Sequence, residues 1–440
     1  MPPNVLLIVT DDQRSESLNV MRAVSSEIGD RGIRFRNAVV AVPTCGPNRV
    51  SLLTGQHAHA HGCYVNPTTA SDFAPTDGRQ IGAWLRGVGY RTGLFGKYLN
   101  GNRALSDTYV PPGWDAWDTI RGQGGYYDYD LQHNDYGGGR VGVVVHYGSA
   151  TRDYFSDVIT DKASGFIRST PPSVPVFAYV AYNAPHSPYV PARRHKGSLA
   201  AMAPWRPPSY DEDDVSDKPA WLRDRPKWDA ATRAMHDGQR VTQLETLLSV
   251  DEGVSALIQT LQEVGRLADT LIVYTSDNGF LWGEHRLWGK SVPYRPAHEI
   301  PLQLRWDARI TPGLTVPIPV STTDISATLL AVSGATPSRI QDGRSLGPFF
   351  RNASAPIGRE RVFFEKQTGG GVPGFCAVRD ESHLYVRYPG GEEEFYNYAK
   401  DPHELEDRVE DPASQDTVKM LRNRTKNWCE PLPPGMGSWG

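Results

Sequence analysis

Val5-Leu-Leu-Ile-Val9 is an unbroken apolar run of strand length, and Thr10-Asp11-Asp12-Gln13 follows it directly. A strand that is apolar at every position is typical of a parallel sheet covered by helices on both faces. Two adjacent carboxylates at the end of such a strand repel each other, and a hard divalent cation is the simplest compensation. The alternative interpretation is a solvated turn in which Asp12 caps the next helix.

Three further strand-like runs also end in ligand-type or charged residues. They are Tyr90 to Phe95, which leads to Lys97, Val174 to Tyr182, which leads to His186, and Asp269 to Thr275, which leads to Asp277 and Asn278. In open α/β sheets, ligand sites lie beyond the carboxyl ends of the strands. If the four strands are parallel neighbours, these residues share one cleft. We therefore predict an α/β fold with a large, mostly parallel sheet flanked by helices.

A cysteine lies at the start of a predicted helix in Cys45-Gly-Pro47-Asn-Arg49-Val-Ser-Leu-Leu-Thr-Gly55. Pro47 suits a first helical turn, and Gly55 is a plausible stop. The unpaired N–H groups of a helix start favour negative charge, and Arg49 can point its donors toward the same place. The pattern indicates an oxyanion site beside Cys45. A buried, weakly reactive thiol is the alternative interpretation.

This stretch resembles the signature of the type I sulfatase family at Cys45, Pro47, Arg49 and Leu53-Thr-Gly55. It departs from that signature at Asn48, where most members have Ser. The resemblance implies that a separate enzyme converts Cys45 to formylglycine, whose hydrated aldehyde is the nucleophile. It spans nearly the entire chain and implies an alkaline-phosphatase-like fold. The spelling Gly96-Lys-Tyr-Leu-Asn100 is similar to the glucosamine-6-sulfatase branch.

The resemblance also implies roles for individual residues. The expected catalytic residues are Cys45, Arg49, Lys97, His186 and Lys290. The expected ligands of Ca²⁺, with Mg²⁺ as the alternative ion, are Asp11, Asp12, Asp277 and Asn278. We expect Asn100 and His285 to line the substrate pocket, together with His61, which is one of three alternating histidines after Gly55.

The predicted function is hydrolysis of a sulfate monoester, from a sulfated sugar or an aryl sulfate. One alternative is a phosphomonoester, phosphodiester or phosphonate ester hydrolase on the same scaffold, because the same residues would suit a phosphoryl group. The other is a non-catalytic carbohydrate-binding protein in which Cys45 stays unmodified. The sulfatase interpretation implies two partners, a saccharide or small-molecule sulfate ester and the formylglycine-generating enzyme.

The 440 residues are 39% hydrophobic and 22% charged, with a formal net charge of −4. Since no basic block stands out, we expect no nucleic-acid partner. No apolar run reaches the length of a membrane span, so we expect no membrane association. The first strand begins too early for a signal peptide, which predicts a cytoplasmic protein, or a periplasmic or secreted one if a leader was removed.

The pattern changes after Gly347, where short runs predict antiparallel strands and a final helix. We therefore predict a catalytic domain over 1–350 and a C-terminal subdomain over 351–440, with a small antiparallel sheet. Cys376 and Cys429 could pair within that subdomain. Farther upstream, Met235 to Val264 predicts a pair of amphipathic helices.

Overall fold

The computed structural model describes residues 2–122, 124–134 and 142–437. Its main body is an eleven-stranded sheet. The strands are β1 (Asn4–Thr10), β2 (Ile33–Val39), β3 (Arg91–Gly96), β4 (Ala116–Ile120), β5 (Tyr129–Asn134), β6 (Val143–Tyr147), β7 (Val176–Ala181), β8 (Thr270–Ser276), β11 (Glu299–Arg305), β12 (Leu314–Val316) and β13 (Val320–Ser321). Their order is β12-β2-β11-β8-β1-β7-β3-β4-β5-β6, with β13 paired to β2 outside this path.

Strand β1 lies at the centre of the sheet, parallel to β7 on one side and to β8 on the other. All of its residues are buried. Val5, Leu7 and Val9 belong to one hydrophobic core, whereas Leu6 and Ile8 belong to a second core on the opposite face. Successive side chains of a strand point to opposite faces, so an uninterrupted apolar run places hydrocarbon on both sides of the sheet.

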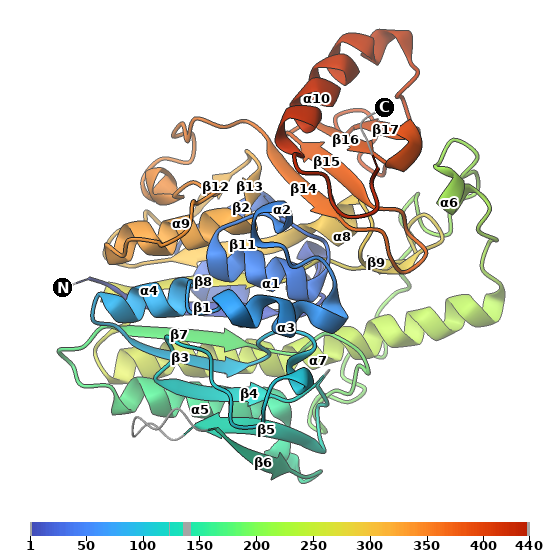
Figure 1. The fold of residues 1–440 in the computed structure, drawn as a ribbon. Helices are drawn as coiled ribbons and strands as arrows, with labels where there is room; N and C mark the ends of the chain where they lie inside the picture. Colours follow the sequence, from blue (N-terminus) through green and yellow to red (C-terminus); the bar gives the residue numbers. More distant parts are fainter. Residues whose placement is uncertain (1, 123, 135–141, 438–440) are drawn as a thin grey trace.

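Helices cover both faces of the sheet (Figure 1). One face is covered by α1 (Cys45–Thr54), α4 (Ile81–Gly87) and α9 (Thr322–Ser333), and the other by α5 (Phe155–Ser169) and α7 (Ala230–Glu263). The predicted α/β class, with a large and mostly parallel sheet, is confirmed.

Helix α7 is one continuous helix of 34 residues, not the predicted pair of helices. Its glycine at position 253 does not interrupt it. A Cβ at Gly253 would lie 2.5 Å from Thr160 Oγ1 and 2.6 Å from the Tyr182 hydroxyl, so the glycine permits close packing against α5. In Figure 1 the amino-terminal part of α7 projects beyond the sheet.

The carboxyl-terminal part of the chain forms a second, antiparallel sheet in the order β14-β15-β16-β17. Its elements are β14 (Val362–Lys366), β15 (Phe375–Arg379), β16 (His383–Arg387), β17 (Glu393–Asn397) and the helix α10 (Gln415–Trp428). Cys376 and Cys429 form a disulfide that joins β15 to the end of α10. The sheet shares a hydrophobic core with Leu281 and Tyr294 of the main body. The domain boundary near residue 350 stays a prediction.

The remaining short α-helices and strands lie mostly in the loops that connect the longer strands. They are α2 (Ala58–His61), α3 (Thr69–Phe73), α6 (Ala220–Arg223), α8 (Arg295–His298), β9 (Leu281–Trp282) and β10 (Trp288–Gly289). None of the helices within the described ranges combines the length and the apolar character needed to cross a bilayer.

The topology gathers several loops at one edge of the large sheet. Strands β8, β1, β7 and β3 are mutually parallel, and β11 runs antiparallel to both β8 and β2. Strand β2 therefore points the same way as the other four. The segments that follow these five strands meet beyond their carboxyl ends, where ligand sites of α/β sheets are expected.

Candidate active site

Cys45 is the first residue of α1, and Thr44 precedes it in an extended conformation. The Cys45 side chain has no exposed surface. Its Sγ lies 3.4 Å from Asp11 Oδ1 and 3.9 Å from Asp12 Oδ1, and the Lys290 ammonium contacts it from another side. The cysteine of the predicted signature thus lies directly against the acidic pair that follows β1.

The four residues predicted to bind a metal lie side by side at the ends of β1 and β8: Asp11, Asp12, Asp277 and Asn278. The last paired residues of these strands are Thr10 and Ser276, so the two acidic segments begin in register. The Asp12 N–H donates to Asp277 Oδ1 at 3.2 Å. Carboxylate oxygens of all three aspartates and Cys45 Sγ lie within 4.8 Å of one another.

Each of these carboxylates has a cationic partner. The pairs are Lys97 with Asp11, Lys290 with Asp12, and Arg49 with Asp277, in which Arg49 Nε donates to Oδ2 at 2.7 Å. Burial by itself opposes ionisation of Asp11, but Lys97 and three further basic side chains hold the pKa of Asp11 well below its usual range. Burial and the charge of Asp11 raise the pKa of Asp277.

Two buried polar atoms of this cluster have no hydrogen-bond partner among the described residues. They are Asn278 Oδ1 and Arg49 Nη2. Arg49 Nη2 lies 4.0 Å from Asp11 Oδ2, beyond hydrogen-bond distance. Buried polar groups are nearly always paired in folded proteins. Carboxylate and amide oxygens are the ligands that Ca²⁺ and Mg²⁺ prefer, so the donor set fits a hard divalent cation. The free Arg49 N–H groups fit an oxyanion beside it.

The thiol of Cys45 is a poor nucleophile in this setting. Burial and the charge of Asp11 raise the pKa of Cys45 to about 12, although Lys290 and Lys97 oppose that shift. Only the thiolate form of a cysteine is strongly nucleophilic. An unmodified Cys45 would therefore remain protonated at neutral pH.

His186 lies on the loop that follows β7, next to the acidic cluster. Its Nε2 lies 3.8 Å from Asp12 Oδ2, and its Nδ1 lies 2.8 Å from the Ser187 carbonyl oxygen. That carbonyl can only accept, so Nδ1 carries the proton in the neutral ring and Nε2 faces the cluster without one. The Tyr126 hydroxyl donates to the His186 carbonyl at 2.7 Å and fixes the loop.

Of two residues predicted to line the substrate pocket, Asn100 is buried and His61 is partly exposed. Asn100 follows β3, is 2% exposed, and has an unpartnered Oδ1 among the described residues. His61 uses both ring nitrogens locally, with Nε2 at 3.0 Å from Ser51 Oγ and Nδ1 accepting from the Cys63 N–H at 3.1 Å. Their roles in substrate binding stay predictions.

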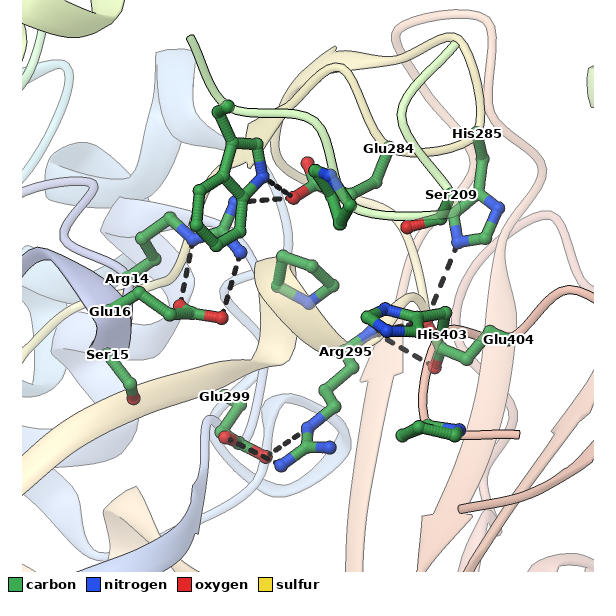
Figure 2. Close-up of a pocket in the computed structure, with 14 residues that line it drawn as sticks. Arg14, Ser15, Glu16, Ser209, Glu284, His285, Arg295, Glu299, His403 and Glu404 are labelled. Carbon is green, nitrogen blue, oxygen red and sulfur yellow. Dashed lines mark hydrogen bonds and ion pairs between the residues drawn. The ribbon is translucent and has the colours of Figure 1, made fainter. Parts of the chain in front are cut away.

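The third of these residues, His285, lines a cavity of about 230 Å³ between the main body and the segment 402–404 that follows β17. Figure 2 shows its ring beside Ser209, with Glu404 and His403 opposite. His285 Nδ1 lies 2.6 Å from Glu212, and Nε2 lies 3.7 Å from Glu404. Both ring nitrogens of His285 thus face carboxylates of the protein. The role of His285 in substrate binding stays a prediction.

Sequence reasoning missed two residues that hold the segment around Cys45. Asn66 Oδ1 accepts from the Gly46 N–H at 2.8 Å, in the first turn of α1. Ser291 Oγ lies 2.8 Å from Thr44 Oγ1, which links the Lys290 segment to the residue before Cys45. Neither contact has a signal in the sequence, because both partners come from loops distant along the chain.

Comparisons with known proteins agree with this geometry. Residues 3–335 match the family model described as Sulfatase, and residues 283–430 match the model described as N-sulphoglucosamine sulphohydrolase, C-terminal. The "Extracellular sulfatase SULF-1 homolog" of Drosophila melanogaster is 33% identical over 365 residues, 81% of this chain and 32% of that protein. The chain thus spans about a third of the length of that relative.

The "N-acetylglucosamine-6-sulfatase" of Homo sapiens is 31% identical over 385 residues, 84% of this chain and 68% of that protein. Among solved structures, one protein in complex with its substrate D-glucosamine-2-N,6-O-disulfate superposes with a TM-score of 0.82. It is 23% identical, and the match covers 98% of each chain. At this level of identity, the similarity to the solved structure shows the fold alone.

Proposed function

Because the chain belongs to the sulfatase family, we propose that it hydrolyses a sulfate monoester to an alcohol and inorganic sulfate. One observation carries the proposal: Cys45 begins a buried helix with its Sγ 3.4 Å from an aspartate of an oxygen-rich cluster. The basic residues Arg49, Lys97 and Lys290 surround the same point. This combination suits a dianionic tetrahedral group next to a nucleophile.

Asp11, Asp12, Asp277 and Asn278 would hold the divalent cation, with Ca²⁺ proposed and Mg²⁺ as the alternative. Support comes from the clustered carboxylate oxygens and the unpartnered Asn278 Oδ1. A bound cation would lower the pKa of a neighbouring oxygen nucleophile and polarise a sulfate oxygen.

Cys45 would be converted to formylglycine by the maturation enzyme that the family uses, and the hydrated aldehyde would supply the attacking hydroxyl. The high pKa of the Cys45 thiol supports this proposal, since the unmodified side chain stays protonated. Nucleophilic catalysis of this kind divides one difficult displacement into two easier steps.

The remaining residues bind the sulfate and move a proton. Arg49 has a free Nη2 for a sulfate oxygen. When the carboxylates are shared with a cation, the ammonium groups of Lys97 and Lys290 can turn to the sulfate. His186 presents an unprotonated Nε2 toward the cluster in its neutral form, so His186, once protonated, or Lys290 would give a proton to the departing alcohol.

We propose a sulfated saccharide as the substrate, with a 6-sulfated N-acetylhexosamine as the first candidate. The similarity to the human protein supports this class, because that relative is named for such a substrate. Asn100 has a buried amide oxygen that could accept a hydrogen bond from a sugar hydroxyl. His61 and His285 remain further candidates for substrate contacts.

The test is sulfate release from N-acetylglucosamine-6-sulfate, an aryl sulfate and the matched phosphate esters, with and without a calcium chelator. We expect release from the sulfated sugar and its loss with the chelator. Faster turnover of a phosphate ester would favour a phosphoester or phosphonate ester hydrolase. If no ester is cleaved and the mass of the Cys45 peptide equals that of a free thiol, the protein is a non-catalytic binding protein.

We also propose that the protein works in an oxidising compartment outside the cytoplasm. The Cys376–Cys429 disulfide supports this, because disulfides persist in such compartments and are rare in the cytosol. A peptide map without reduction, made on protein isolated from its source, should contain the linked pair. Free thiols at both positions would contradict the proposal.

A further inference from the structure

Asn48, the residue at which the chain departs from the signature, is 1% exposed and makes four side-chain hydrogen bonds. Its Oδ1 accepts from the N–H groups of Ala41, at 3.0 Å, and Val42, at 3.4 Å. Its Nδ2 donates to the Asp277 carbonyl at 2.6 Å and to Thr322 Oγ1 at 3.3 Å. Both amide protons and both acceptor positions are therefore in use.

These partners belong to three separate parts of the fold. Ala41 and Val42 lie between β2 and α1, on the way to Cys45, whereas Asp277 follows β8 and Thr322 begins α9. The neighbouring Arg49 donates to the carboxylate of Asp277 at 2.7 Å. Asp277 is thus held at its carbonyl by Asn48 and at its carboxylate by Arg49, and both contacts come from the helix that Cys45 begins.

A serine at position 48 could not reproduce this arrangement. The Ala41 N–H and the Asp277 carbonyl lie at opposite ends of the planar Asn48 amide. A single hydroxyl oxygen, one bond from Cβ, cannot reach both ends. At least one buried backbone group would lose its partner, which costs more than the mean value of a hydrogen bond.

We propose that Asn48 is a positioning residue that holds Asp277 for cation binding and so fixes the cation site relative to Cys45. This inference rests on the proposed cation site. Protein groups occupy all four hydrogen-bonding positions of the Asn48 amide, so Asn48 would act through Asp277 rather than on substrate or cation directly. Its replacement should weaken cation binding beyond the effect of losing a buried asparagine elsewhere.

The test is a calorimetric titration of Ca²⁺, and separately of Mg²⁺, into the full chain with unmodified Cys45. Asn48→Ser should bind Ca²⁺ about ten-fold more weakly than the wild type, the equivalent of roughly 1.4 kcal/mol. The matched control is Asn4→Ser at the opposite end of β1. Asn4 is also buried and bonds Asp269, Val176 and Arg266. We expect its Ca²⁺ affinity to change by less than about two-fold, although both variants lose hydrogen bonds.

A second variant keeps the test decisive if Asn48→Ser does not fold. Thr322→Val retains Asn48 but removes one of its four partners, and we expect an affinity loss of about two- to three-fold, from a single hydrogen bond. The inference is overturned if Asn48→Ser binds Ca²⁺ as tightly as the wild type. If Asn48→Ser does not fold, wild-type affinity in Thr322→Val overturns it. A loss of Ca²⁺ affinity in Asn4→Ser equal to that in Asn48→Ser also overturns it. A wild type that binds neither ion overturns the cation site as well.

Discussion

Two largely buried charge clusters differ in how completely their polar groups are paired. The Asp11 cluster, defined as Asp11, Asp12, Asp277, Asn278, Arg49, Lys97 and Lys290, contains the unpartnered atoms Asn278 Oδ1 and Arg49 Nη2. The His285 cluster is defined as Glu212, His285, Arg295, Tyr398 and Glu404. There, each buried side-chain oxygen and nitrogen has a partner within the described chain.

We interpret this difference as that between the proposed binding site and a structural joint. Glu404 accepts from the Arg295 N–H at 3.0 Å and from the Tyr398 hydroxyl at 2.8 Å, and it faces His285. Such a network is complete without a ligand and joins the C-terminal sheet to the main body. The Asp11 cluster is incomplete, because an unpaired buried polar group is costly unless something binds it.

Replacement of Cys45 should give the largest effect. Cys45→Ser retains a small polar side chain but lacks the thiol that the proposed maturation enzyme would oxidise, so the rate of sulfate release should fall by at least about 10³-fold. The midpoint of thermal unfolding should change little, since the substitution is nearly isosteric. The two measurements are sulfate release and calorimetry. Full activity in Cys45→Ser would refute the proposed nucleophile.

Asp277→Asn should remove the response of the protein to calcium. At a Ca²⁺ concentration near 100 times Kd, binding stabilises the wild type by about 2.7 kcal/mol, and this gain should vanish in the variant. Glu404→Gln is the matched control, because it also neutralises a buried carboxylate but should retain the gain. Thermal unfolding with calcium and with chelator measures the contrast. Equal calcium responses in both variants would remove the distinction between the clusters.

Glu404→Gln should instead destabilise the fold whether or not calcium is present. The variant leaves His285 with one carboxylate partner instead of two, and breaking a buried charged pair is costly. We expect the free energy of unfolding to fall by about 2 kcal/mol, as measured in urea. Stability equal to the wild type would show that the His285 cluster is not a structural joint.

The last prediction is a change in how stability depends on pH. Burial alone would lower the pKa of His285, but hydrogen bonds to Glu212 and Glu404 raise it from 6.5 to about 9. A raised pKa stabilises the fold fully below pH 6.5, and this contribution is lost as the pH rises through about 9. His285→Gln should be less stable at pH 6 and should lack this decline. Parallel pH profiles for both proteins would contradict the assignment.

The parts of the fold that the sequence predicts are those with local signals. Apolar runs such as Val5 to Val9 indicate buried strands because both faces of the sheet need hydrocarbon. Because those strands are parallel, the residues that follow them lie at the same edge of the sheet, beyond the carboxyl ends of the strands. The structure brings Asp11, Lys97, His186 and Asp277 together at that edge for this reason.

The rest depends on partners that no local pattern specifies. The sequence suggests two helices where α7 is continuous, because the fit of Gly253 against Thr160 is a property of the packed pair α5 and α7. His285 lies in a motif that suggests a site, yet Glu212 and Glu404 occupy its ring nitrogens. In the sequence, Asn48 is only a departure from the family signature, and its four hydrogen-bond partners become visible only in the folded structure.

The complete burial of Cys45 has a consequence for the order of events in biosynthesis. A side chain with no exposed surface offers no access to another enzyme's reaction centre once α1 has docked. The proposed oxidation of the thiol to an aldehyde would therefore precede the final closure of the chain around it. Rapid folding and complete maturation would then compete, and the yield of active molecules would depend on which of the two is faster.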